Sequence, residues 1–151
     1  MISPSGRNRR GSNIIEFSLL MPWYVFLFVG TFNYGFFAYS LIAAQSAARE
    51  AAVYCAANSS TAADSTTACG YVLDQLRNLP NVGSGLTTCG TSSVTAAAPV
   101  AVTATSVSTG ADGNPATSVT VTYLTPQFVP IPGIFPGQLT ITQTVQIRIR
   151  S

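Results

Sequence analysis

The stretch RRGSNIIEFSLLMPWYVFLFVGTFNYGFFAYSLI, residues 9–42, contains a long apolar run that begins directly after two arginines and a glycine. No charged residue occurs from Phe17 to Ala48, a stretch of 32 residues. A helix needs about 20 apolar residues to cross a bilayer. The run therefore predicts a membrane-spanning helix, with its span at about residues 14–39. It also raises the question of why a carboxylate, Glu16, lies at the start of that span.

The length of the run argues against an ordinary cleaved secretory signal. The apolar core of such a signal has about 7–15 residues, and the run here is about twice as long. Pro22 lies about two turns into the run, where a proline removes a backbone hydrogen bond and is expected to bend or loosen the helix. We therefore expect a persistent helix rather than a segment that signal peptidase removes.

Charge is scarce and unevenly placed. Charged residues make up 8% of the 151 residues, compared with roughly 25% in ordinary soluble domains. Arg7, Arg9 and Arg10 precede the apolar run, whereas the chain from residue 12 onward carries four arginines and five acids. A basic N-terminal flank predicts a cytoplasmic N-terminus. The remainder has no basic surface, so nucleic acid is not expected as a partner.

The helix is expected to continue beyond the span, because residues 40–58 are rich in alanine, the residue with the highest helix propensity. An unbroken helix over residues 13–57 would be about 65–70 Å long at about 1.5 Å per residue. Alanines recur at every fourth position in this part, and such a line lets another helix approach closely. The line predicts packing either on the chain's own domain or on a helix of an assembly; its members are Ala44, Ala48 and Ala52.

All three cysteines, Cys55, Cys69 and Cys89, follow the apolar run, and the chain contains no histidine. Zinc sites are built from clustered cysteine and histidine ligands, so no metal site is expected. A disulfide in an oxidising compartment is the better interpretation. We expect Cys69 to pair with Cys89, with a bond between Cys55 and Cys69 as the alternative.

A second, shorter helix is predicted over residues 61–79, followed by Pro80. Thr66 or Thr67 is the expected N-terminal cap, since a threonine hydroxyl accepts hydrogen bonds from free backbone N–H groups. The apolar residues of this segment recur on roughly one face. These residues are Tyr71, Val72, Leu76 and Leu79.

Three later segments predict an antiparallel sheet. Residues 100–107 and 117–124 flank the turn-rich segment 108–116 and indicate a hairpin. Residues 139–150 alternate apolar and polar side chains, and Gln143 interrupts the apolar face, which marks a bulge or a sheet margin. We expect an α+β fold with three or four antiparallel strands packed on the long helix and the short one.

The segment TPQFVPIPGIFPG, residues 125–137, contains four prolines and predicts a crossing loop rather than a central strand. Its Phe128 and Phe135 form either a partner-binding patch or a plug at the edge of the core. The plug is the interpretation that we expect, since such residues more often cover the edge of a small core.

No set of residues in the sequence indicates an enzyme. Without histidine a Ser–His pair is impossible, the five acids are dispersed, and no phosphate-binding loop is present. We therefore expect no catalytic residues and no cofactor.

The segment RRGSNIIEF, residues 9–17, resembles the processing site of type IV pilin-like proteins. In these proteins a membrane prepilin peptidase cuts after a glycine, and a glutamate is the fifth residue of the mature chain, followed by an aromatic residue. The resemblance places the cut between Gly11 and Ser12, with Glu16 fifth and Phe17 next. In related fibres this glutamate neutralises the N-terminal amine of a neighbouring subunit. The alternative role of Glu16 is to cap the first helical turn, where the helix dipole favours an acid.

Together with the early Pro22 and the exit AAQSAAREAA, the pattern from residue 7 to about residue 55 resembles the TadE-like pseudopilins of the tight-adherence (Tad/Flp) branch. The resemblance implies a pseudopilin or minor pilin that primes, caps or joins a tight-adherence type IVc pilus. It implies as partners a prepilin peptidase, other pilin and pseudopilin subunits, the inner membrane and the Tad assembly platform. In this setting the alanine line would contribute helix packing.

The expected organisation has three parts: a basic cytoplasmic leader over residues 1–11, a long helix over residues 12–58, and an extracytoplasmic α+β domain over residues 59–151. The expected location is the bacterial inner membrane, with the N-terminus in the cytoplasm and the C-terminal domain in the periplasm, or outside the cell within the pilus. The alternative function is an uncleaved, single-pass anchored periplasmic binding module.

Overall fold

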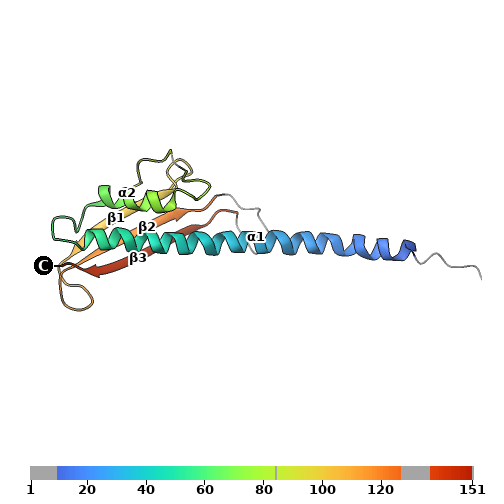
Figure 1. Cartoon of the computed structure of the whole chain (residues 1–151), viewed down its shortest axis with the longest axis horizontal. Helices are drawn as coiled ribbons and strands as arrows, with labels where there is room; N and C mark the ends of the chain where they lie inside the picture. Colours follow the sequence, from blue (N-terminus) through green and yellow to red (C-terminus); the bar gives the residue numbers. More distant parts are fainter. Residues whose placement is uncertain (1–9, 84, 127–136, 151) are drawn as a thin grey trace, which may run out of the picture. The chain divides into compact units, whose positions relative to one another are not determined.

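The computed structural model describes residues 10–83, 85–126 and 137–150 (Figure 1). Along the chain lie two helices and three strands, which confirms the α+β class and the predicted order of elements. The loop residues Phe128 and Phe135 lie outside the described residues. The elements are α1 (Arg10–Cys55), α2 (Ser65–Leu76), β1 (Val100–Val107), β2 (Ala116–Leu124) and β3 (Thr140–Arg148).

The chain divides within α1 into two compact units. The first unit comprises residues 1–35 and the second residues 36–151. The described part of the first unit is helix alone, whereas the second contains the C-terminal part of α1, α2 and the sheet.

Helix α1 continues through Pro22 without a break in its helical backbone. Because proline has no N–H, the carbonyl of Ser18 one turn earlier lacks its usual helical partner. The helix ends at Cys55, three residues before the expected end at Asn58. The Asn58 side chain explains the turn that follows, since its Oδ1 accepts hydrogen bonds from the backbone N–H groups of Ser60 at 3.1 Å and Thr61 at 3.0 Å.

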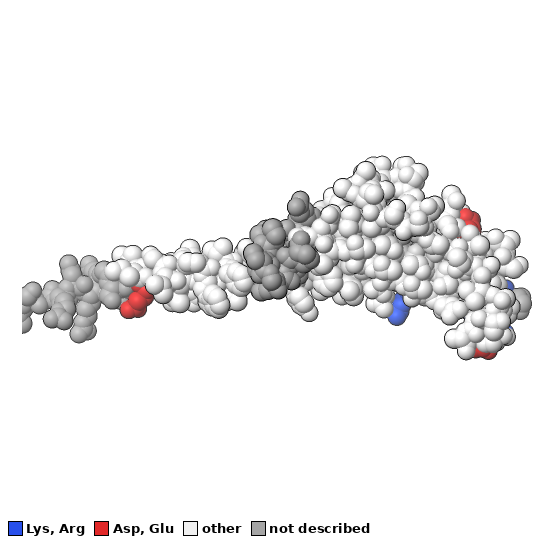
Figure 2. Space-filling view, turned by 180° about the vertical axis from the view of Figure 1, so that it is seen from behind, with Lys and Arg blue, Asp and Glu red and all other residues white. Residues whose placement is uncertain are grey.

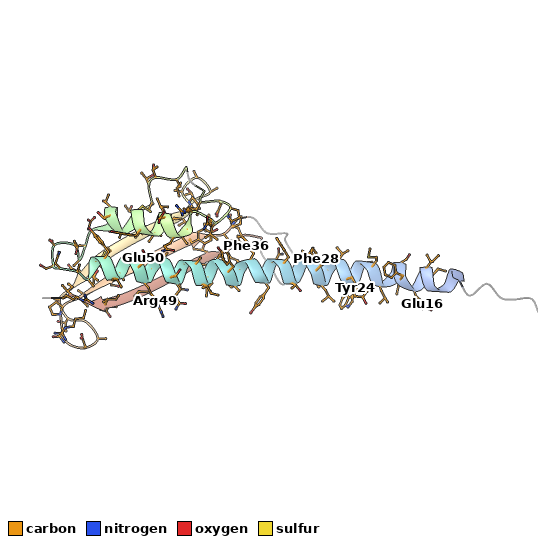
Figure 3. All side chains as sticks on the ribbon, in the orientation of Figure 1. Glu16, Tyr24, Phe28, Phe36, Arg49 and Glu50 are labelled. Atoms are coloured by element: carbon orange, nitrogen blue, oxygen red, sulfur yellow. A yellow bond between two sulfur atoms is a disulfide. The ribbon has the colours of Figure 1, made fainter. Side chains whose placement is uncertain are left out.

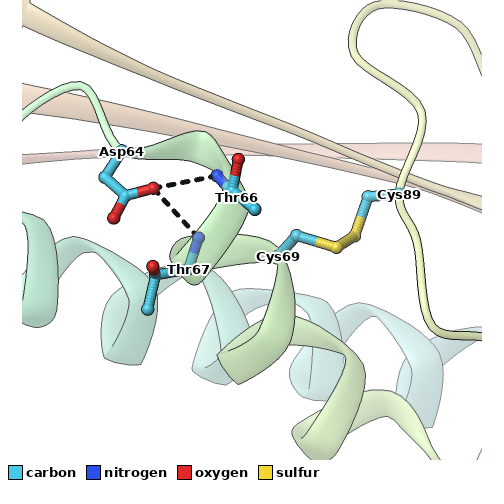
Figure 4. Close-up of a disulfide and its surroundings, with 5 residues drawn as sticks. All are labelled: Asp64, Thr66, Thr67, Cys69 and Cys89. Atoms are coloured by element: carbon cyan, nitrogen blue, oxygen red, sulfur yellow. Dashed lines mark hydrogen bonds between the residues drawn. A yellow bond between two sulfur atoms is a disulfide. The ribbon is translucent and has the colours of Figure 1, made fainter.

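The N-terminus of α2 is capped by Asp64 rather than by the predicted Thr66 or Thr67. Asp64 Oδ1 accepts hydrogen bonds from the backbone N–H groups of Thr66 at 3.1 Å and Thr67 at 3.0 Å (Figure 4). A carboxylate suits this position because it satisfies two free donors and is favoured by the helix dipole. The bond from Thr67 is the main reason why the pKa of Asp64 is lowered from its ordinary value.

The buried face of α2 contains three of the four predicted residues. Val72 and Leu76 are fully buried, and Leu79, just beyond the helix, is buried with them. Tyr71 was predicted on this face but is 41% exposed. Its ring packs instead on Tyr54 of α1, with ring centroids 5.0 Å apart. Leu73 is buried in its place. Helix α2 contacts β1 as well as α1, so its buried side is set by both neighbours.

The sheet has the strand order β1-β2-β3, and both neighbouring pairs are antiparallel. The hairpin of β1 and β2 and the C-terminal strand are therefore as predicted. The bulge proposed at Gln143 is wrong, because Gln143 pairs directly with Val121 in an uninterrupted register. Gln143 lies on the apolar face of an edge strand, where its side chain is only half-buried. A polar residue is therefore tolerated there without the extra residue that a bulge would insert.

Both helices pack on one face of the sheet, and the other face is open. The side chains toward the helices are buried, among them Val102, Val119, Val121 and Tyr123, whereas the alternating threonines of β3 are exposed. On the helical side of this core, five alanines of α1 have no exposed surface: Ala44, Ala47, Ala48, Ala51 and Ala52. Small side chains at these positions allow the α1 backbone to lie close to its neighbours.

A disulfide joins Cys69 of α2 to Cys89, with a Cα–Cα distance of 5.9 Å (Figure 4). This is the pairing expected first from the sequence, and the alternative bond between Cys55 and Cys69 is not formed. Cys55 is a buried free thiol, and burial raises its pKa, with a smaller contribution from the carboxylate of Asp64. The bond fixes the connection after α2 beside the first strand of the sheet.

Removing this disulfide should destabilise the second unit. The double variant Cys69→Ser/Cys89→Ser is expected to lose about 3 kcal/mol of unfolding free energy, the amount associated with closing a loop of this length. The measurement is urea denaturation of the full chain in detergent micelles, followed by far-UV circular dichroism. The wild-type protein under reducing conditions is the matched control and should show the same loss. An unchanged unfolding midpoint in both samples would contradict the structural role of the bond.

A second prediction concerns Tyr123, whose side chain is fully buried in β2. Its hydroxyl donates to Oδ1 of Asn81, and Nδ2 of Asn81 donates to the carbonyl of Leu124 at 2.6 Å. Burial raises the pKa of Tyr123 to about 12. The folded state therefore favours the neutral phenol, so this stabilisation is complete below pH 10 and is lost as pH rises from about 10 to about 12.

Tyr123→Phe should cost about 1–3 kcal/mol of unfolding free energy at neutral pH, because Asn81 then keeps a buried acceptor without its donor. The variant should also lose stability less steeply than the wild type between pH 10 and pH 12. Urea midpoints at a series of pH values measure both effects. If the urea midpoints of the two proteins fell in parallel between pH 10 and pH 12, the pH-dependent loss of stability would not come from the Tyr123 phenol.

Candidate processing and assembly site

The predicted processing residues lie in the first turns of the described part of α1. Gly11 and Ser12 are the second and third residues of the helix, and Glu16 follows Ser12 by four positions. Residues four apart lie on the same face of a helix, about 6 Å apart along the axis at about 1.5 Å per residue. Glu16 and Phe17 are both exposed (Figure 3). The carboxylate is therefore accessible one turn away from the amine that a cut before Ser12 would create.

The bond between Gly11 and Ser12 lies in helical backbone. A peptidase must reach the carbonyl of Gly11 from one side, so cleavage requires the first turn to open. The first four N–H groups of a helix have no helical partner, and helix ends open at low cost in free energy. Glycine lowers this cost further because it has the weakest helix preference apart from proline.

Glu16 lies beyond the first turn of α1. The helix begins at Arg10 in the described chain, and its first turn contains no acid. The alternative role of Glu16 as a first-turn cap stays a prediction. Its position is inside the apolar part of the helix, where a charge is costly unless it finds a partner.

A continuous apolar surface surrounds the helix next to Glu16. Every large apolar side chain from Ile14 to Phe28 is at least 40% exposed, including Trp23 and Phe26, whose rings stack with centroids 5.9 Å apart. We call residues 14–28 the apolar sleeve. Monomeric soluble proteins rarely expose so large an apolar surface. Helix α1 is long and apolar enough to cross a membrane, and a lipid environment would cover the sleeve.

The alanine line is used inside the chain. Ala44, Ala48 and Ala52 have no exposed surface and belong to the core of the second unit. The predicted assembly role for this line is therefore wrong, because side chains already buried on their own domain cannot receive a helix of another subunit. The alternative, packing on the chain's own domain, is what the structure shows. The opposite side of the same stretch is exposed, with Ile42 at 65% and Val53 at 60%.

The described residues offer little for small-ligand chemistry. Across residues 10–83, 85–126 and 137–150, no three histidine, cysteine or acidic side chains lie close enough together to hold a metal ion. A shallow pocket beside the disulfide is lined by Ser65, Thr66 and Thr88 among others, and no charged side chain lines it. The residues that carry functional information are therefore those of α1.

Comparison with known protein families gives a match over most of α1. Residues 11–53 match the family described as TadE-like protein. The match begins at Gly11 and ends two residues before the end of α1, so it covers less than a third of the 151-residue chain. No curated protein and no solved structure matches the chain. The resemblance to TadE-like proteins is thus confirmed over residues 11–53, which links the chain to the Tad pilus system.

The apolar sleeve should be required for membrane insertion. The double variant Val25→Arg/Phe28→Arg places two charges near the middle of the expected span, and each should cost about 2.5–3.5 kcal/mol on insertion. The matched control, Ile42→Arg/Val53→Arg, alters exposed apolar residues of the same helix beyond the span. The measurement is the fraction of full chain that resists carbonate extraction from membranes. We expect a fall of at least tenfold for the first variant and little change for the control; equal retention of both would contradict the assignment.

Proposed function

We propose, from the TadE-like character of residues 11–53, that this protein is a minor pilin or pseudopilin of a tight-adherence pilus. The observation that carries the proposal is the family match beginning at Gly11, combined with Glu16 at the fifth position after it. The apolar sleeve supports membrane residence before assembly, since its side chains are exposed in the isolated chain.

In the proposed pathway a prepilin peptidase hydrolyses the bond between Gly11 and Ser12. The leader of residues 1–11 is released, and Ser12 acquires a free α-amine. The carboxylate of Glu16 then neutralises the α-amine of a neighbouring subunit within the apolar surroundings. Pairing two opposite charges offsets part of the cost of holding each of them near hydrocarbon. This contact would fix the axial position of one subunit against the next.

The second unit would lie outside the cytoplasm. The arginines before the apolar run favour a cytoplasmic N-terminus, and the disulfide between Cys69 and Cys89 suits an oxidising compartment. In the branch that the chain resembles, the major pilin is much shorter. A domain of this size therefore favours priming, capping or occasional incorporation over the role of main fibre subunit. The protein itself performs no reaction in this proposal; the peptidase supplies the chemistry.

The proposal is tested by separating processing from assembly. Gly11→Leu should reduce the processed fraction at least tenfold, because the peptidase requires glycine before the cut. Glu16→Gln should be processed normally, yet its amount in the sheared pilus fraction should fall at least tenfold, because the amide carries no charge to pair with the amine. Glu50→Gln is the control: Glu50 is exposed and accepts a hydrogen bond from Gln75, so the change should alter neither step.

Immunoblots with an antibody against this chain measure processing in whole cells and assembly in the sheared pilus fraction. If Gly11→Leu and Glu16→Gln both leave pilus production and protein location unchanged, the pilin proposal fails. An uncleaved, membrane-anchored binding module would then be the better function, because an anchor requires neither residue.

A further inference from the structure

The two edges of the three-stranded sheet differ in how their backbone groups are used. At the β1 edge, the N–H of Gly90 donates to the carbonyl of Val100 at 2.9 Å, and the carbonyl of Gly90 accepts from the N–H of Val102 at 3.0 Å. The N–H of Ala104 donates to the hydroxyl of Ser65 at 2.9 Å. Cys89, held by the disulfide, directly precedes Gly90. The β1 edge is therefore closed by the chain itself from Val100 to Ala104.

The hydrogen bonds at the two ends of the β2–β3 ladder show which backbone groups of β3 face away from the sheet. One residue beyond the paired residues at either end, the N–H of Thr125 donates to the carbonyl of Leu139 at 2.8 Å, and the N–H of Ile149 donates to the carbonyl of Pro115 at 3.0 Å. Bonding pairs alternate along an antiparallel ladder, so the odd-numbered residues of β3 bond to β2. The backbone N–H and C=O groups of the even-numbered residues point outward. These are Thr140, Thr142, Thr144, Gln146 and Arg148.

Within the described chain, no hydrogen bond engages these outward backbone groups. All five residues are exposed. Natural sheets usually protect such an edge with a proline, a bulge, a short strand or an inward-pointing charge. From Thr140 to Arg148 the strand has nine residues, a continuous register and no proline, and its only charge is at its last position. Beyond Arg148, the next outward N–H, that of Arg150, donates to the carbonyl of Ala56 at 2.9 Å. From Thr140 to Arg148 the edge is unbonded within the described residues, and an edge of this length is a template for another strand.

The side chains beside the edge are also incompletely covered. Ile141 is buried, with 4% of its surface exposed, whereas Val145 and Ile147 on the same face are only half-buried. An additional strand beside β3 would extend the apolar face and cover these two residues. The edge thus offers both free backbone groups and a matching apolar strip.

The charges near this edge are mainly positive. Charged atoms are sparse on the surface (Figure 2), so a few side chains decide the local potential. Arg148 and Arg150 are exposed on the β3 side. Asp112 lies close enough to Arg148 to feel its charge, which contributes slightly to the lowered pKa of Asp112, and so offsets one of the two.

A third cation, Arg49, lies on α1. It points away from α2, whereas the neighbouring Glu50 bonds to Gln75 of α2 (Figure 3). No ion pair engages these arginines within the described residues. A second copy of the chain would bring two cationic edges together, whereas a strand with carboxylates would be attracted.

We propose that the β3 edge binds an extended strand of a partner protein whose side chains include carboxylates. The mode is strand addition, in which main-chain hydrogen bonds supply affinity and alternate side chains supply specificity. Apolar side chains of the added strand would lie on Val145 and Ile147, and its acids, on the opposite face, would lie beside Arg148 and Arg150. This inference depends on the second unit alone and holds whether or not Gly11 is a cleavage site.

The test uses the full chain in detergent micelles and two synthetic peptides. One peptide is Thr-Val-Glu-Val-Thr-Val-Glu-Val-Thr, and the other has lysine in place of both glutamates. We expect at least tenfold tighter binding of the acidic peptide by fluorescence anisotropy. Hydrogen exchange at the amides of Thr142, Thr144 and Gln146 should slow at least tenfold when it binds, since these are the outward N–H groups.

Two matched proline variants locate the binding edge. Thr144→Pro removes an outward N–H from β3 and should abolish binding, while an edge position tolerates the proline. Ser106→Pro makes the same change at an even-numbered residue of β1, on the opposite edge of the sheet, and should leave binding intact. If Thr144→Pro disturbs the fold, Arg148→Ala/Arg150→Ala serves instead and should remove the preference for the acidic peptide.

Three results would overturn the proposal. The first is equal binding of the acidic and basic peptides. The second is slowed exchange at β1 rather than at β3. The third is a dimer of the chain that protects the β3 amides in the absence of peptide, because a second copy would then be the occupant.

Discussion

The contact on which the second unit depends is the close approach of α1 to the rest of the domain along its alanine line. Ala44, Ala48 and Ala52 are completely buried, yet their side chains supply little apolar area. Larger residues of the same core, such as Leu76 and Tyr123, are also completely buried. Larger side chains on the line would separate these layers and open cavities, which cores tolerate poorly. The alanine-rich exit of the helix is therefore explained by the domain itself.

The same helix meets two different environments. In the second unit its buried side is fixed by packing within the chain, whereas the apolar sleeve of residues 14–28 has no cover in the isolated chain. One helix thus contributes small residues to a protein core and carries large apolar residues on a part that is long and apolar enough to cross a membrane. The TadE-like match over residues 11–53 covers both parts.

The sequence predicted the fold well where periodicity is simple, and less well where side chains compete. Residues 100–107 form β1 as predicted, because an apolar, β-branched segment followed by a turn-rich segment and a second such strand indicates a hairpin without ambiguity. Asp64 was missed as the cap of α2 because several cap-forming residues lie together there. Tyr71 was misjudged because the exact rotation of α2 depends on tertiary packing. At Gln143 the sequence left a bulge and a sheet margin open, and the continuous register with Val121 excludes the bulge. The ambiguity of the alanine line likewise required the structure, whereas Gly11 and Glu16 are visible only as a sequence pattern.

The most direct test of this account is the N-terminus of the protein recovered from membranes, measured by intact mass with the prepilin peptidase present and absent. The account predicts a chain that begins at Ser12 only when the peptidase is present. A chain that begins at Met1 under both conditions would contradict the pilin pathway and leave a membrane-anchored α+β domain.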